Sequence, residues 1–220
     1  MNLALFDFDG TITSQDTFTA FMNFAIDPWR LAVGKVLLAP LVLGYKAGVV
    51  SPSNTRRMVV WAGLRGIPES QAQQAGVAFA QNVLPSLVRL QALERIRWHQ
   101  ARGDKVVVVS ASLNVYLVEW CRQLELDLLC SELEVKAGYL TGRYRLPDCC
   151  GAEKSRRVMA QYDLATYRLV YAYGDTPEDL DMLSLADVPV YQWNQIQART
   201  LVQDLTKRSN RRVLLRSPRG

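Results

Sequence analysis

The stretch "ALFDFDGTIT", residues 4–13, places two aspartates one residue apart directly after an apolar run. The run Leu3–Phe6 is short and continuous, and a glycine follows soon after it, a pattern that predicts a buried strand. An unpaired charge inside such a strand is costly. We therefore expect Asp7 and Asp9 at the carboxyl end of the strand, where a cation can reach them. The alternative is an ordinary turn at Asp9-Gly10 with a solvated acid.

Two further apolar runs also end in polar side chains. Residues 105–109 are a β-branched run followed by Ser110, and residues 168–173 lead to Gly174-Asp175. A last strand is expected at 188–192, and a hairpin at 133–142. Strands that alternate with helices predict an α/β fold with a doubly wound, Rossmann-like parallel sheet, which binds its ligands beyond the carboxyl ends of the strands.

Residues 14–85 carry only helical patterns, and they separate the first strand from the rest of the sheet. Helices are expected at 16–26, from residue 28, at 52–64 and at 66–85, with Pro28 suited to a first turn. Further helices are expected at 86–102, 115–124 and 153–162. The predicted organisation is a core of residues 1–13 and 86–198, an inserted all-helical cap of residues 14–85, and a basic C-terminal tail of residues 199–220.

The composition, 49% hydrophobic and 21% charged over 220 residues, is typical of a globular protein. The four cysteines lack C-x-x-C spacing, so neither a disulfide nor a zinc framework is expected, and a reducing cytoplasm fits best. The single histidine, His99, is interpreted as a surface or packing residue. The start of the chain lacks a basic region, so we expect no signal peptide.

The most membrane-like stretch, residues 36–45, lies between Lys35 and Lys46. It is shorter than the roughly 20 residues that span a bilayer. Two alternatives stay open: peripheral contact with the inner face of the membrane, or packing inside the helical cap.

Most of the basicity lies at the end of the chain. Residues 199–220 contain seven basic residues and one acid, so this segment carries +6 and the rest of the chain −1, which gives the net +5. Such a tail docks on nucleic acid or anionic lipid, or is simply solvated. It has no interleaved aromatic residues, so no specific nucleic-acid partner is expected.

Acids, a lysine and a hydroxyl are expected to meet at one edge of the sheet. Carboxylate and carbonyl oxygens suit Mg²⁺, and a lysine with a hydroxyl suits phosphate oxygens. The residues concerned are Asp7, Asp9, Ser110, Lys154, Asp175 and Asp179. Each has a plain alternative: Ser110 and Asp175 as helix caps, Lys154 as a solvated lysine, Asp179 as a surface acid.

Four motifs, "DFDGT" (7–11), "VVVSAS" (107–112), "GAEKSRR" (151–157) and "GDTPEDLDML" (174–183), together resemble the haloacid dehalogenase superfamily in order and spacing. The resemblance covers about residues 1–195. The helical insertion resembles the cap of the phosphoserine-phosphatase-like subfamily IB. It looks nearest to the phosphatidylglycerophosphatase C branch, because of the long apolar segment with Pro40 and the aspartate at position 16.

The resemblance implies a Mg²⁺-dependent phosphomonoester hydrolase that works through an aspartyl-phosphate. It makes Asp7 the nucleophile and Asp9 the acid and base. It implies a metal site formed by Asp7, the backbone carbonyl of Asp9, Asp175 and Asp179. It also implies a phosphate site formed by Ser110, Lys154 and the backbone of Gly10 and Thr11.

Four residues depart from the phosphoserine phosphatase pattern: Asp16 in place of glutamate, Ala111 and Ser112 in place of glycines, and Glu178 in place of asparagine. The expected partner is therefore a phosphorylated small molecule or a lipid head group, with Asp16 a candidate substrate contact. Three alternatives stay open: a phosphatidylglycerophosphate-type lipid phosphatase at the membrane surface, a phosphoserine-like small-molecule phosphatase, and a phosphate-binding regulatory module without turnover. The presence of Asp9 argues against the module.

Overall fold

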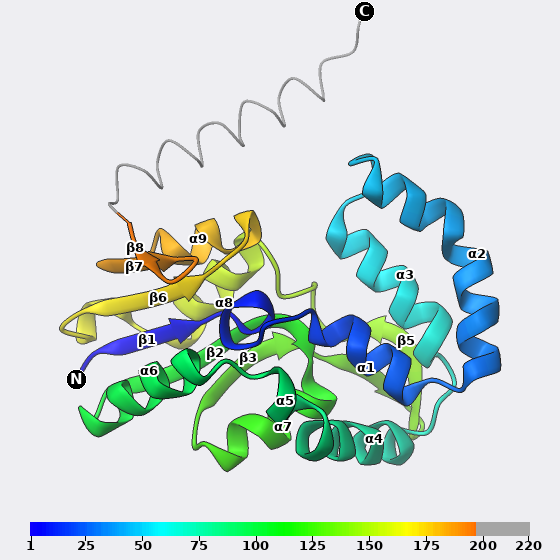
Figure 1. The fold of residues 1–220 in the computed structure, drawn as a ribbon, viewed down its shortest axis with the longest axis horizontal. Helices are drawn as coiled ribbons and strands as arrows, with labels where there is room; N and C mark the ends of the chain where they lie inside the picture. The colour runs from blue at the N-terminus through cyan, green and yellow to red at the C-terminus, as the bar shows by residue number, and fades with distance from the viewer. Residues whose placement is uncertain (197–220) are drawn as a thin grey trace, which may run out of the picture.

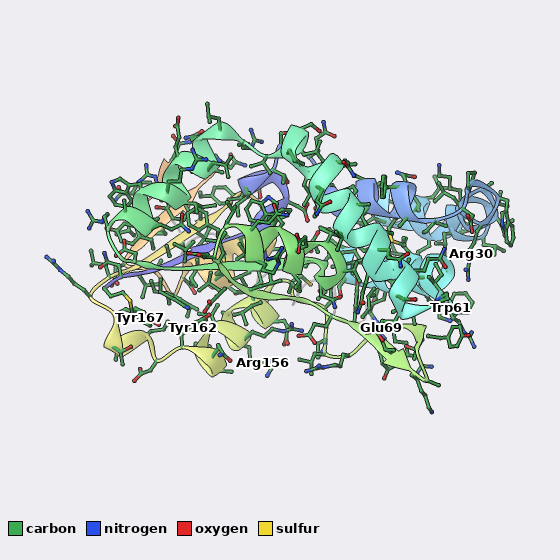
Figure 2. The ribbon with its side chains drawn as sticks, turned by 90° about the horizontal axis from the view of Figure 1, so that it is seen from below. Arg30, Trp61, Glu69, Arg156, Tyr162 and Tyr167 are labelled. Carbon is green, nitrogen blue, oxygen red and sulfur yellow. The ribbon has the colours of Figure 1, made fainter. Side chains whose placement is uncertain are left out.

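The structure is a computed structural model, which describes residues 1–196; the predicted tail, 199–220, lies outside the described residues. Figure 1 shows an α/β part built around a sheet and a helical part that extends to one side of it. Figure 2 shows Arg30 and Trp61 at the end formed by the helical part, and Tyr162 and Tyr167 toward the opposite end of the molecule. The cavity described below lies between the two parts.

The sheet confirms the predicted fold class. In the described chain its strand order is β3-β2-β1-β6-β7-β8, and all neighbours are parallel except β7 and β8. The antiparallel strand β8 and the edge strand β3 were not predicted. The bounds are β1 Leu3–Phe6, β2 Lys105–Leu113, β3 Asp127–Ser131, β6 Val170–Gly174, β7 Val188–Tyr191 and β8 Asn194–Gln195.

Helices cover both faces of this sheet. Side chains alternate along each strand, so the apolar strands present apolar side chains on both faces, and each face needs a cover. Ala4 and Phe6 pack in one buried cluster with residues of α6 and α7, while Leu3 and Leu5 pack in a second cluster with residues of α8 and α9. The helices are α6 Leu90–Ala101, α7 Asn114–Gln123, α8 Ala152–Gln161 and α9 Leu180–Leu183. Short 3₁₀ turns lie at Leu164–Thr166 and Pro177–Asp179. With both faces covered, the carboxyl ends of the strands form the accessible edge.

The helical part consists of α1 Thr17–Ala25, α2 Pro28–Lys46, α3 Pro52–Leu64 and α4 Glu69–Asn82. Pro28 and Pro52 stand in first turns, where a missing N–H costs nothing. The Ser51 hydroxyl caps α3 by accepting the N–H of Asn54 at 3.2 Å. These helices match the predicted ones to within a few residues.

The helix predicted at 86–102 is wrong at its start. A short helix, α5 (Leu84–Leu87), ends there, Val88 and Arg89 are extended, and α6 begins only at Leu90. The chain extends because Val88 forms an antiparallel bridge with Thr13, and the N–H of Arg89 donates to the carbonyl of Ile12 at 2.8 Å. The chain thus leaves the sheet and returns to it along two adjacent backbone segments.

The predicted hairpin is present as β4 (Leu133–Lys136) and β5 (Tyr139–Tyr144). Both turn residues have positive φ, Ala137 at 51° and Gly138 at 79°, as a two-residue hairpin turn requires. The hairpin also pairs with the loop between α3 and α4, since the N–H of Leu140 donates to the carbonyl of Ile67 at 2.9 Å. It therefore fastens the helical part to the α/β part.

His99 is a packing residue rather than a surface one. Its side chain is fully buried, with Nδ1 2.9 Å from a carboxylate oxygen of Asp104 and Nε2 2.9 Å from the hydroxyl of Tyr173. Burial lowers the pKa of His99, although the contact with Asp104 opposes that shift. The single histidine therefore belongs to the core beneath β6.

Candidate active site

The loop after β1 brings its two aspartates to the accessible edge of the sheet. The N–H of Asp7 donates to the carbonyl of Tyr173 at 2.9 Å, which ties the start of the loop to β6. Gly10 has φ +81°, and a Cβ there would collide with the carboxylate of Asp175. A glycine is required at this position because only glycine combines that backbone conformation with so close a neighbour.

Lys154, in the first turn of α8, lies at the centre of the site. Its side chain is buried, and its ammonium donates to Oδ1 of Asp7 and, at 2.6 Å, to Oδ1 of Asp179. Burial favours the neutral amine, but the two carboxylates outweigh it and raise the pKa of Lys154. Lys154 is therefore a charged, buried lysine, and the alternative of a solvated first-turn lysine does not hold.

Asp179 is also buried, which excludes the surface alternative. Its Oδ2 accepts the N–H groups of Asp175 at 3.1 Å and Thr176 at 2.9 Å, so it fixes the loop that carries Asp175. Burial works against its ionisation, but the adjacent Lys154 is decisive and holds the pKa of Asp179 below its usual value. Thr176, rather than Asp175, caps the turn that follows.

Three carboxylates converge here. Asp7, Asp175 and Asp179 each offer an oxygen, and these oxygens lie within 4.8 Å of one another. Burial and then the charge of Asp179 raise the pKa of Asp7 well above its usual value, and the same two causes raise the pKa of Asp175. One ammonium does not balance three carboxylates. The donor set and the uncompensated negative charge therefore fit a hard divalent cation such as Mg²⁺.

The carboxylate of Asp9 points away from this cluster. It accepts the N–H of Thr17 at 2.7 Å, the Thr17 hydroxyl at 2.5 Å and the hydroxyl of Ser112. Burial raises the pKa of Asp9, while these hydrogen bonds oppose the rise. Asp9 is therefore an organised group rather than a solvated turn residue.

Ser110 and Thr11 also lie at the edge of the sheet. Ser110 is buried in β2 and accepts the N–H of Ser112 at 3.0 Å, so it does not cap a helix. The hydroxyl of Thr11 donates to Oδ1 of Asp175 at 3.1 Å. The predicted phosphate-site residues thus lie beside the carboxylates.

A cavity of about 1200 Å³ opens in front of these groups. Its floor includes Asp7, Ser110 and Lys154, and its opposite wall is formed by residues of α1, α2 and α3. Asp16 lines it from the start of α1, but its Oδ1 caps that helix through the N–H groups of Phe18 at 3.0 Å and Thr19 at 3.3 Å.

Arg56 of α3 is a residue of the cavity wall that sequence reasoning missed. Its guanidinium donates to Asp148 at 2.9 Å and to Glu178 at 3.3 Å, so it links the helical part to two loops of the α/β part. Burial works against its charge, yet the two carboxylates raise the pKa of Arg56. Nothing in the local sequence distinguishes it from its neighbour Arg57, because its partners lie about 100 residues away.

Comparisons with known proteins agree with this geometry. A family model described as haloacid dehalogenase-like hydrolase matches residues 4–184. Protein CicA of Caulobacter vibrioides is 33% identical over 200 residues, which cover 86% of this chain and 85% of CicA.

Solved structures share the fold. A Bordetella pertussis protein of unknown function has a TM-score of 0.75 at 22% identity, covering 86% of this chain and 89% of its own. A substrate-bound complex of phosphoserine phosphatase and a phospho-aspartyl intermediate analogue of that enzyme have TM-scores of 0.63 and 0.62 at 22% identity; each covers 86% of this chain and, respectively, 85% and 84% of its own. At such identities this likeness shows the fold alone. The resemblance inferred from the four motifs is confirmed: the chain belongs to the haloacid dehalogenase-like hydrolase family.

Proposed function

We propose that the protein hydrolyses phosphate monoesters through an aspartyl-phosphate on Asp7, in a Mg²⁺-dependent reaction. The observation that carries this proposal is the buried ammonium of Lys154 between Asp7 and Asp179, beside Asp175 and at the floor of the cavity. This arrangement offers a carboxylate nucleophile and positive charge for a phosphoryl group at the same place.

Two displacements at phosphorus complete the reaction. In the first, a carboxylate oxygen of Asp7 forms a bond to phosphorus as the bond to the leaving oxygen breaks, and Asp9 gives that oxygen a proton. In the second, Asp9 takes a proton from water, whose oxygen attacks the phosphorus. The bond to Asp7 then breaks, and inorganic phosphate leaves. Ser110, Lys154 and the backbone N–H groups of Gly10 and Thr11 hold the phosphate oxygens.

The metal belongs to the acidic cluster. Asp7, the backbone carbonyl of Asp9 and Asp175 would hold Mg²⁺, and Asp179 positions the loop of Asp175. When bound, the ion supplies positive charge that offsets the carboxylates and the phosphate.

Residues 14–85 act in this proposal as a cap over the cavity, and residues 1–13 and 86–198 as the catalytic core. The cavity wall formed by α1, α2 and α3 supports this division. Substrate recognition then falls to cap residues, among them Asp16.

The experiment is a panel of soluble phosphate esters assayed with and without Mg²⁺. Wild type hydrolyses at least one ester, chelation stops the reaction, Mg²⁺ restores it, and Ca²⁺ restores it poorly because it prefers more ligands at longer distances. Asp7→Asn, which keeps the shape but loses the attacking oxygen, abolishes turnover. Substantial activity in purified Asp7→Asn would overturn the assignment. Phosphate binding without turnover in wild type would favour the regulatory module instead.

A second candidate, a phosphatase acting on lipid phosphates at a membrane surface, is favoured by α2. This helix is apolar on two sides: Leu38 and Val42 line the cavity, while Trp29, Val36 and Leu37 are 70%, 75% and 67% exposed. Besides Arg56, which is paired with Asp148 and Glu178, residues 28–57 contain four basic residues and no acid, which suits an anionic surface. In residues 1–196 no helix is long and apolar enough to cross a membrane.

Substitutions at two neighbouring residues of α2 test the lipid phosphatase candidate against the phosphatase for soluble esters. Val42→Asp places a charge in the cavity wall, whereas Leu43→Asp changes a side chain that is 66% exposed. If acyl chains enter the cavity, Val42→Asp lowers activity on a short-chain, monomeric lipid phosphate and spares the best soluble ester, while Leu43→Asp affects neither. Equal losses on both substrates in Val42→Asp would exclude the lipid candidate.

A further inference from the structure

Both carboxylate oxygens of Asp9 are held by groups from other elements. Oδ1 accepts two donors from Thr17, the N–H at 2.7 Å and the hydroxyl at 2.5 Å. Oδ2 accepts the hydroxyl of Ser112, near the end of β2. Asp9 therefore connects the first residue of α1 to the central part of the sheet.

This environment is buried and ordered. Thr17 and Tyr116 are fully buried and Ser112 is 1% exposed, although Ser112 also borders the cavity. The hydroxyl of Thr17 lies 3.1 Å from that of Tyr116 and 3.4 Å from that of Ser112. The backbone of Ser112 is fixed in turn, since its N–H donates to Oγ of Ser110 at 3.0 Å. The three hydroxyls therefore form one connected group around Asp9.

The two oxygens differ in their surroundings. Oδ1 accepts both of its hydrogen bonds from Thr17, which is fully buried, whereas Oδ2 accepts its hydrogen bond from Ser112, which borders the cavity. The hydrogen bond from Ser112 therefore orients the Asp9 carboxylate on the cavity side.

We propose that Ser112 is a positioning residue: its hydrogen bond holds Oδ2 of Asp9 at the cavity, in the orientation from which Asp9 serves the leaving group. The proposal rests on the proposed function and deepens it, because it adds a residue that acts through Asp9. It assigns the hydroxyl of Ser112 a task separate from the phosphate contact of Ser110.

The test compares two leaving groups. An alkyl phosphate needs a proton on its departing oxygen, whereas 4-nitrophenolate leaves without one. Ser112→Ala is expected to lower kcat/KM for the best alkyl phosphate by about tenfold or more, and for 4-nitrophenyl phosphate by no more than about twofold. Ser112→Thr, which keeps a hydroxyl, restores most of the activity on the alkyl ester.

Ser110→Ala is a comparison from the same strand. It removes a phosphate contact and also the acceptor of the Ser112 N–H, so it lowers kcat/KM for both esters, and more for the alkyl phosphate. A loss in Ser112→Ala that is equal for the two esters, or no loss on the alkyl ester, would overturn the positioning role.

Crystal structures of wild type and Ser112→Ala provide a readout that does not need turnover. The carboxylate of Asp9 keeps its orientation in wild type and turns away in the variant. If wild type hydrolyses neither ester, the proposed function fails. The crystal structures still test the positioning role: an Asp9 carboxylate that has turned in Ser112→Ala supports it, and one that has not moved overturns it.

Discussion

Asp16 both caps a helix and lines the cavity, so a single substitution cannot separate its structural effect from its effect on substrate binding. It caps α1 through two backbone N–H groups, and it lines the cavity. Asp16→Asn keeps a good cap and removes the charge, whereas Asp16→Ala removes both and costs about 1 kcal/mol of helix stability. The pair therefore separates the structural effect from the effect on substrate.

We predict that Asp16→Asn raises KM more than it lowers kcat, because loss of a binding contact acts on ground state and transition state alike. Steady-state kinetics on the best substrate checks this. Asp16→Ala is expected to show the same raised KM as Asp16→Asn, together with a lower melting temperature than wild type. An unchanged KM in Asp16→Asn would remove Asp16 from substrate recognition.

His99 is the only histidine in the 220-residue chain, so its ring protons can be followed without ambiguity. Burial lowers the pKa of His99 from its ordinary value of 6.5, so we predict an NMR titration midpoint below 6.5. The unfolded chain binds a proton at higher pH than the folded one, so this residue's contribution to stability is lost as pH falls below about 6.5. A midpoint above 6.5 would mean that Asp104 outweighs burial.

For single residues, sequence motifs predict the site residues that stand in a fixed local pattern. Asp7, Lys154 and Asp179 lie in motifs, and the structure brings them into contact. Arg56 and Tyr116 carry no such signal. Their positions in the site come from α3 and α7, which only the tertiary fold brings to Asp148 and Thr17.

Within the helical part, glycines distinguish the docked helix α4 from the exposed helix α2. A Cβ on Gly76 of α4 would collide with the backbone carbonyl of Val115 in α7, whereas a Cβ on Gly34 of α2 would meet nothing within 4 Å among residues 1–196. The close approach of α4 to α7 therefore depends on Gly76, while Gly34 only weakens its own helix.

We predict opposite effects on stability from the two alanine variants. Gly76→Ala forces α4 away from α7 and lowers the free energy of unfolding by about 1–3 kcal/mol. Gly34→Ala raises it by at most about 1 kcal/mol, because alanine favours the helix. Urea denaturation followed by circular dichroism measures both. Tolerance of Gly76→Ala without loss would contradict the packing of α4 on α7.

The elements that sequence reasoning missed are those whose form is set by distant partners. Strand β3 follows α7 after a turn at Glu125, whose φ is 55°, and its apolar run, residues 128–130, is only three residues long. The extended break before α6 exists because Thr13 pairs with Val88. By contrast, β1 and β2 were predictable because full burial demands uninterrupted apolar residues.

At the scale of the whole molecule, the acidic cluster that would bind Mg²⁺ lowers the stability of the metal-free fold. Burial and Asp179 raise the pKa of Asp175, so its ionised form destabilises the metal-free fold. We predict that Asp175→Asn raises the melting temperature without metal. Mg²⁺ stabilises wild type, by about 2.7 kcal/mol at a hundred times Kd. It does not stabilise the variant.

Differential scanning fluorimetry with Mg²⁺, Ca²⁺ or a chelator measures these shifts. Lys105→Ala is a matched control, because Lys105 pairs with Asp127 at 2.7 Å, at the other end of β2 from Ser110. That variant keeps the response to Mg²⁺. An equal Mg²⁺ shift in wild type and Asp175→Asn would place the ion elsewhere.

The bridge between Thr13 and Val88 has an evolutionary consequence. The two ends of the segment between Thr13 and Val88 are hydrogen bonded to each other. The segment therefore leaves and re-enters the α/β part at one point and does not separate neighbouring strands of the sheet. Insertions between adjacent chain ends are the kind that recombination tolerates best. If this segment recognises the substrate, as proposed above, a gene that exchanges it at these two points gives a lineage a new specificity with the old chemistry unchanged.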